Sequence, residues 1–142
     1  MSDIRIKNFI NGEWQEEAGG KHVPLYNPST GEEIGSVPIS GPVTAEAAIA
    51  TAHAAYRPWR NLSLAKRMAY IYQIHDCMAR DQEKLAQAIA LDQAKHVSEA
   101  RGEVQRVIEI LESAAATPSM IQGDTLDYIS TNISAKVVRE PL

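Results

Sequence analysis

The sequence predicts an α/β fold in which β-hairpins come first, three or four packed helices follow, and a terminal β-strand arm comes last. Three stretches of different composition indicate this order. Residues 1–42 are rich in turn formers, residues 43–122 in the helix formers Ala, Leu, Ile, Glu and Gln, and residues 123–142 in Thr, Ile, Val and Tyr, which favour strands. With 142 residues, 44% of them hydrophobic and 23% charged, the chain has the composition of a folded protein and is long enough to bury a core.

Two hairpins are expected before residue 43. In the first, Asn11 and Gly12 lie between apolar residues and favour a type I′ turn, because both central positions of that turn need a positive φ. In the second, residues 23–26 pair with residues 34–37, and the segment between them contains the Pro and Gly that suit a chain reversal.

Helical periodicity predicts the elements that follow. Thr44 is the expected cap of the first helix, and Pro58 its end, since proline has no amide hydrogen to donate. Ser63 is the expected cap of the second helix. Asp81 is suited to cap a third helix, although residues 64–95 can also form one broken rod.

Each expected helix carries an apolar stripe that faces a core. The last helix is expected to begin at Ser98 and to end before Pro118 and Gly123. In chain order, the stripes comprise Ala45, Ala48, Ile49, Ala52 and Tyr56; Leu64, Met68, Ile71, His75 and Met78; Leu85, Ala88 and Ile89; and Val104, Val107, Ile108, Leu111 and Ala115.

Residues 129–138 alternate between two faces, as a strand does. The alternation fits either one half-covered strand or a hairpin broken near Asn132. In both cases the strand needs a partner edge, because an unpaired ladder attracts other chains.

The charge and the apolar runs limit the partners. The chain carries 14 Lys+Arg and 18 Asp+Glu, a formal net charge of −4, whereas sequence-independent nucleic-acid binding needs a clustered positive face. Its apolar runs are far shorter than the roughly 20 residues of a membrane helix, and its first residues lack the layout of a secretory leader. We therefore expect no nucleic acid and no membrane as partner, and a cytoplasmic location.

No set of residues in the chain predicts catalysis or metal binding. The single cysteine, Cys77, is expected to be a small buried hydrophobic residue, because His75 is two positions away and residues at i and i+2 on a helix do not face each other. The four histidines show no H-x₃-H or HExxH spacing, so no metal site is expected. The glycines form no strand-to-helix phosphate loop, so no nucleotide-binding fingerprint is present.

Arg106 is the one candidate binding residue. Glu103 lies three positions before it, so the two share a helix face and form an exposed ion pair in the simpler interpretation. In the alternative interpretation the arginine is held ready for an anionic ligand. Lys95 and Glu99 form a similar i,i+4 pair, for which an exposed ion pair is again expected.

Several motifs, in a shared order and spacing, resemble the aldehyde dehydrogenase family over nearly the whole chain. The segment from Gly102 to Arg106, with the alanine-rich helix end and Pro118 after it, is most similar to the methylmalonate-semialdehyde dehydrogenase branch. One motif departs from the family, because residues 92–95 have alanine where its turn has glycine. The motifs are residues 9–14, residues 27–32, Trp59, Arg67, residues 91–95, Glu99-Ala100 and residues 139–142.

The resemblance implies an NAD-dependent oxidation of methylmalonate or malonate semialdehyde, with transfer of the acyl group to coenzyme A. Arg106 falls on the position thought to meet the substrate carboxylate. The family's nucleophilic cysteine, general-base glutamate and nucleotide-binding residues lie beyond the equivalent of residue 142. The chain is therefore expected to be a catalytically incompetent N-terminal fragment that binds no cofactor by itself, with NAD and coenzyme A used by the full-length parent.

The resemblance also divides the chain. It implies N-terminal β-hairpins at 1–42, a helical layer of the dinucleotide-binding domain at 43–122, and the start of an oligomerisation β-arm at 123–142. Homo-oligomers through this arm and the helical faces are expected. The alternative is a stand-alone helical interaction or oligomerisation module without enzymatic activity.

Overall fold

The computed structural model describes residues 4–17 and 19–140. The strands are β1 (Ile4–Arg5), β2 (Asn8–Ile10), β3 (Glu13–Gln15), β4 (His22–Tyr26), β5 (Glu33–Pro38), β6 (Thr125–Ser130) and β7 (Ile133–Lys136), and the helices are α1 (Pro42–Arg60), α2 (Leu64–Arg80), α3 (Gln82–Gln93), α4 (Val97–Ala115) and α5 (Thr117–Met120). This order confirms the predicted α/β fold of hairpins, packed helices and a terminal strand arm.

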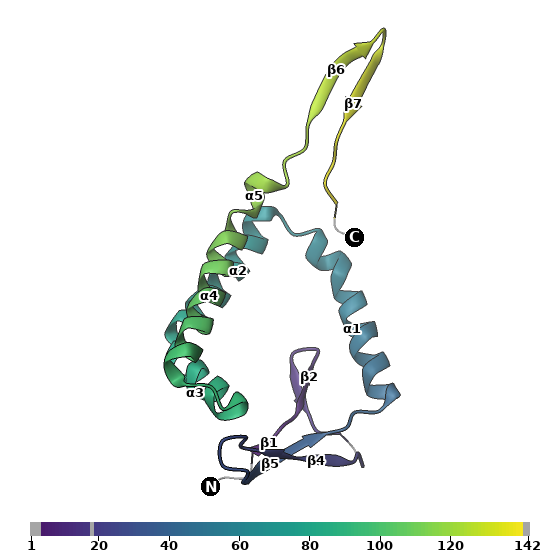
Figure 1. The fold of residues 1–142 in the computed structure, drawn as a ribbon. Helices are drawn as coiled ribbons and strands as arrows, with labels where there is room; N and C mark the ends of the chain where they lie inside the picture. The colour runs from purple at the N-terminus through teal and green to yellow at the C-terminus, as the bar shows by residue number, and fades with distance from the viewer. Residues whose placement is uncertain (1–3, 18, 141–142) are drawn as a thin grey trace.

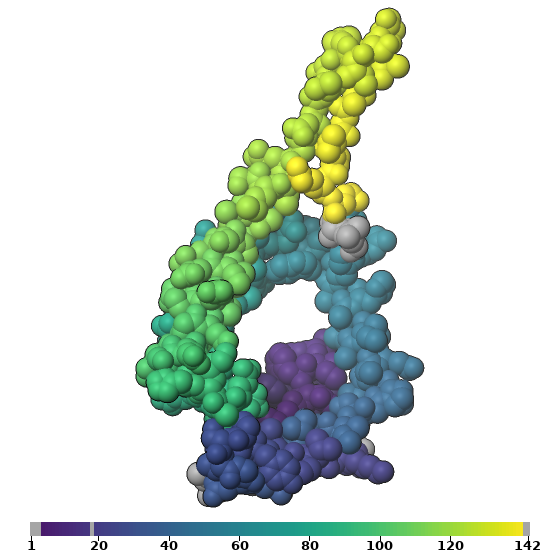
Figure 2. Space-filling model, viewed as in Figure 1, coloured from purple at the N-terminus to yellow at the C-terminus, as the bar shows by residue number. Residues whose placement is uncertain are grey.

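The elements form an open frame (Figure 1). The first five strands lie at one end, α1 forms one side, α2, α3 and α4 form the other, and the β6–β7 hairpin projects from the far end. Figure 2 shows an opening through the middle of the frame, between α1 and the α2–α4 layer.

Turn chemistry explains the first hairpin. β2 and β3 pair antiparallel, and Asn11 and Gly12 between them have φ values of 55° and 80°, as a type I′ turn requires. Phe9 pairs with Trp14 across the strands, with their ring centroids 4.9 Å apart. The predicted hairpin is confirmed.

The second hairpin is also confirmed, and it belongs to a three-stranded sheet. β4 and β5 pair antiparallel, and β1 adds to β5 in parallel, giving the order β1-β5-β4. Gly35 allows β1 to approach, because a Cβ atom there would lie 2.0 Å from the backbone oxygen of Ile4. Pro24 lies on the edge strand β4, where its missing amide hydrogen costs little.

The start of α1 is held by a carboxylate from the strand region. The helix begins at Pro42 with Gly41 at the N-cap, so the prediction that Thr44 is the cap was wrong. The Thr44 hydroxyl donates to Glu17 Oε1 at 2.9 Å, and the Gly41 amide donates to the same oxygen at 3.4 Å. The hydrogen bond from Thr44 is the main cause that lowers the pKa of Glu17. The negative charge of this carboxylate also interacts favourably with the positive end of the helix dipole.

The end of α1 also differs from the prediction. The helix continues through Pro58 to Arg60, because the loss of one amide donor leaves the next bonds intact: the Asn61 amide donates to the Arg57 oxygen at 3.1 Å. The predicted stripe faces no core in this helix, which buries none of its residues; Ile49 is 69% exposed.

The core lies where α4 packs against α2 and α3. Ala86, Ala100, Val104 and Ile108 are its buried residues, with Met78, Leu85 and Ile89 packed against them. Two assignments in the predicted stripes were wrong. Ala88 is exposed and Ala86 faces inward in its place, and Val107 is 41% exposed because it lies beside the inward row rather than on it.

The residues that cap the helices agree only in part with those predicted from the sequence. Ser63 caps α2 as predicted, accepting from the Lys66 amide at 3.4 Å. Asp81 alone separates α2 from α3, which fits both a third helix and one broken rod. Its carboxylate binds Arg80 rather than the helix start, so the predicted cap was wrong. Ser98 was wrongly predicted to cap α4; His96 does so, because its Nδ1 accepts from the Ser98 amide at 3.3 Å.

The terminal arm is a hairpin, as one of the two predicted alternatives had it. β6 and β7 pair antiparallel, and Asn132 in the turn has a φ of 60°. Every residue of both strands is exposed, so the half-covered strand is wrong. Pro118 lies inside the short helix α5, after the end of α4 at Ala115. Pro141 and Leu142 lie outside the described residues.

Glu17→Gln is expected to lower the Tm at pH 7 by a few degrees, because glutamine keeps one acceptor oxygen and loses the charge that faces the start of α1. The folded pKa of Glu17 is below its ordinary value of 4.5. The contribution of the Glu17 carboxylate to the free energy of unfolding is therefore present above pH 4.5 and is lost as the pH falls through the lowered pKa. Thermal unfolding followed by circular dichroism measures both effects. Glu13→Gln, at an exposed position on β3, is the control; equal Tm values for the two variants would contradict the role of Glu17.

Ile108→Ala is expected to destabilise the chain by about 2–5 kcal/mol, because it leaves a cavity in the core. Val107→Ala on the same helix is expected to change the free energy of unfolding by less than about 0.5 kcal/mol, since Val107 is 41% exposed and lies outside the buried row, whereas Ile108 is 6% exposed. Urea unfolding compares the two. Similar losses would mean that α4 is rotated about its axis relative to the arrangement described.

Candidate functional site

The candidate arginine lies on the face of α4 that points away from the core. The inward row of α4 repeats every four residues, at Ala100, Val104 and Ile108. Arg106 follows Val104 by two residues, which is a rotation of about 200° around the helix axis. Its side chain is exposed. The structure therefore places a permanently charged group on the free side of the helix.

The predicted ion pair between Glu103 and Arg106 does not form. Lys95 Nζ contacts Glu103 Oε1 instead, so the predicted pair of Lys95 with Glu99 was wrong as well. The cause is the connection between α3 and α4, where Ala94 adopts the left-handed conformation with a φ of 55°. Within residues 4–17 and 19–140, the Arg106 side chain has no hydrogen bond or ion pair.

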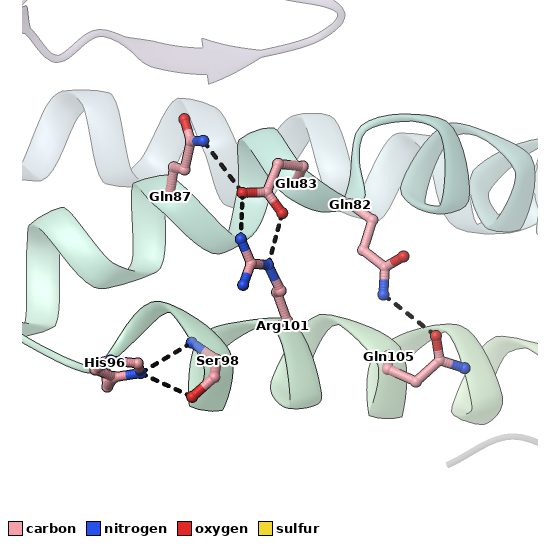
Figure 3. Close-up of polar contacts among 7 residues, drawn as sticks. All are labelled: Gln82, Glu83, Gln87, His96, Ser98, Arg101 and Gln105. Carbon is pink, nitrogen blue, oxygen red and sulfur yellow. Dashed lines mark hydrogen bonds and ion pairs between the residues drawn. The ribbon is translucent and has the colours of Figure 1, made fainter.

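Two other polar side chains of α4, Arg101 and Gln105, are hydrogen-bonded to α3 (Figure 3). Arg101 donates to both oxygens of Glu83 on α3, at 2.7 and 2.9 Å, and this is the main cause that lowers the pKa of Glu83. Gln82 donates to Gln105 at 3.2 Å across the same two helices. These contacts fix α4 against α3 and leave Arg106 as the unpaired cation of the helix, as far as the described residues show.

The helix surface next to Arg106 is unobstructed. Gly102 lies one turn before Arg106, and a Cβ atom added there would meet nothing within 4 Å. Helical side chains tilt toward the N-terminus, so the Arg106 side chain lies over the turn that contains Gly102. A mid-helix glycine costs about 1 kcal/mol relative to alanine. No neighbouring atom within the described part of the chain requires it here.

A separate cleft of about 650 Å³ lies between the end of α1, the start of α2 and the terminal arm. Tyr56 and Trp59 line it from α1, and Arg67 lines it from α2. The Arg67 Nε atom is buried without a hydrogen-bond partner in the described structure. Arg106 is not among the residues that line this cleft, so the two features are distinct.

Cys77 is exposed on α2, so the prediction that it is a small buried residue was wrong. His75 lies on the half-buried face of the same helix, with its Nδ1 3.0 Å from Asp76 and its Nε2 3.5 Å from Glu112 on α4. The contact with Asp76 is the main cause that raises the pKa of His75. Among the described residues, the cysteine and this histidine do not form a nucleophile–base pair.

Two further properties of the described residues bear on the site. They contain no group of three or more His, Cys, Asp or Glu side chains arranged to hold a metal ion. None of their helices combines the length and apolar character that a membrane crossing requires.

An anionic ligand such as a carboxylate suits the charge and the donors of the Arg106 side chain. A guanidinium presents a planar fork of donors that can bind both oxygens of one carboxylate. Arg106 was a candidate from the sequence, whereas the contact of Glu103 with Lys95 across the left-handed turn at Ala94 was not predicted.

The fold agrees with the comparisons with known proteins. Residues 14–142 match the model of the aldehyde dehydrogenase family, and the chain belongs to that family. This confirms the resemblance on which the sequence analysis relied.

The curated relatives are more specific. A malonate-semialdehyde dehydrogenase from Listeria monocytogenes is 39% identical over 143 residues, covering 100% of this chain and 29% of that protein. The chain thus spans well under a third of the length of this relative and matches its N-terminal portion.

Solved structures show the same fold. A structure described as a methylmalonate-semialdehyde dehydrogenase from Sinorhizobium meliloti, complexed with NAD, superposes with a TM-score of 0.92 at 21% identity, covering 99% of this chain and 28% of that chain. The methylmalonate-semialdehyde dehydrogenase from Oceanimonas doudoroffii superposes with a TM-score of 0.85 at 26% identity, covering 90% of this chain and 26% of that chain.

Proposed function

We propose that this chain forms the N-terminal framework of an NAD-dependent aldehyde dehydrogenase that oxidises malonate or methylmalonate semialdehyde. The observation that carries the proposal is the unpaired guanidinium of Arg106 on the free face of α4. It is supported by the name of the Listeria relative, which is 39% identical to this chain over 143 aligned residues.

In this proposal Arg106 binds the substrate carboxylate and orients the aldehyde at the other end. A charge-assisted hydrogen bond contributes about 1.5–3 kcal/mol. Since about 1.4 kcal/mol corresponds to a tenfold change in affinity, one arginine is sufficient to favour a carboxylated aldehyde over a neutral one. NAD would accept the hydride and coenzyme A the acyl group, with both groups bound outside this chain's own residues.

We assign the three parts of the chain to three roles in that enzyme. Residues 1–42 form N-terminal β-hairpins, residues 43–122 a helical layer of the dinucleotide-binding domain, and residues 123–142 the start of an oligomerisation arm. The exposed side of α1 and the uncovered hairpin support these assignments, because both present apolar side chains that other surfaces would cover. By itself, the 142-residue chain is expected to show no dehydrogenase activity.

The alternative is an interaction or oligomerisation module without enzymatic activity. The core between α2, α3 and α4 favours it, because this core is formed entirely by the chain's own helices. Turnover distinguishes the two proposals. A chimera in which this chain replaces the matching N-terminal portion of the Listeria relative oxidises malonate semialdehyde with NAD under the first proposal only.

Arg106→Ala in that chimera is expected to raise the KM for malonate semialdehyde about tenfold or more, and the KM for propanal much less, because only the first substrate carries a carboxylate. Steady-state kinetics with the two aldehydes measures the difference. Arg57→Ala, which removes an arginine from the exposed surface of α1, is the control. Equal effects of Arg106→Ala on both substrates would indicate a structural role.

The arm proposal predicts a change in association. Ile129→Lys on β6 is expected to lower the association state of the chain in sedimentation velocity, because it places a charge on a strand that would join a second copy. Ser130→Lys, which adds the same charge at the polar end of β6, is the control. If Ile129→Lys leaves the association unchanged, the copies associate through the helical faces instead.

A further inference from the structure

Four positions on the same helix lie next to Arg106, two of them one turn before it and two one turn after it. Gly102 has no side chain, and Ile110 is apolar. Glu103 and Glu109 are the two carboxylates that can pair with Arg106. Whether Arg106 is available to a ligand therefore depends on where these two carboxylates are held.

Both carboxylates are held by other residues. Glu103 Oε1 contacts the ammonium group of Lys95. Glu109 Oε1 accepts a hydrogen bond from the side chain of Gln105 at 3.4 Å. Of the two contacts, the one from Lys95 is an ion pair and comes from outside α4, so it competes directly with the positive charge of Arg106.

Lys95 reaches Glu103 because of the chain path between the helices. α3 ends at Gln93, and the left-handed conformation of Ala94 turns the backbone before α4 begins at Val97. The Lys95 side chain is only 27% exposed, whereas that of Glu103 is 48% exposed. The lysine is thus the less exposed partner, and the contact holds the more exposed carboxylate on its side of the helix.

We propose that Lys95 is a positioning residue: it holds the Glu103 carboxylate away from Arg106 and thereby keeps the Arg106 guanidinium available to the carboxylate of a ligand. The ligand in this inference is the carboxylated substrate class of the proposed function, on which the inference rests. Without Lys95, Glu103 pairs with Arg106 along the helix and competes with the ligand.

The experiment uses the 142-residue chain labelled with ¹⁵N and follows the side-chain Nε–Hε signal of Arg106, assigned with Arg106→Lys. The first reading needs no ligand. Lys95→Met is expected to shift this signal, because Glu103 is released to bind Arg106, and Lys95→Met with Glu103→Gln is expected to return it to the wild-type position. Lys84→Met, which removes an equal charge from α3, is expected to leave the signal in place. An unshifted signal in Lys95→Met would overturn the inference.

The second reading is a titration with malonate, with malonamide as the neutral control. Malonate is expected to bind Lys95→Met about twofold more weakly than the wild type, the size of one i,i+3 ion pair on a helix, and the double variant to regain wild-type affinity. Binding that is equal in the wild type and Lys95→Met contradicts the inference alone. If malonate moves the Arg106 signal in no variant while the ligand-free shift and its rescue are seen, the proposed ligand is wrong and the positioning role stands.

Discussion

The packing of α4 against α2 and α3 holds together the part of the chain that carries Arg106. Ala86 and Ala100 are both fully buried at this contact, and such small side chains let helices approach closely. Around this apolar centre, the pairing of Glu83 with Arg101 fixes α4 relative to α3. Because the inward row of α4 is set by this packing, the direction in which Arg106 points is set by it too.

The molecule has one region in which the helices cover each other's apolar residues, and a second region in which the apolar residues are exposed. The helices α3 and α4 bury apolar residues against each other and against the partly buried Met78 of α2, whereas α1 buries none and the β6–β7 hairpin is exposed along its whole length. Under the proposed function, these uncovered surfaces are where the rest of the enzyme would pack, and Arg106 would be the binding group that this framework carries.

Local chemistry made much of the fold predictable from the sequence. The turn at Asn11 and Gly12 and the cap at Ser63 depend on neighbouring residues, and both are as predicted. Contacts between distant residues were not predictable in this way. Glu17 stabilises the start of α1 from a position 27 residues before Thr44, and Lys95 binds Glu103 across the left-handed turn at Ala94. The helix α3 has alanines on both sides, so its hydrophobic periodicity does not show whether Ala86 or Ala88 faces the core.

The isolation of α1 has a consequence for how the chain opens. Its hydrogen bonds are surrounded by water, so the helix can fray and re-form while the α2–α4 core stays intact. Its amide protons are then free to exchange with solvent through local opening, without global unfolding. A surface that covers α1 would make this helix unfold together with the core. Protection of the α1 amides against hydrogen exchange would then show, residue by residue, where that surface binds.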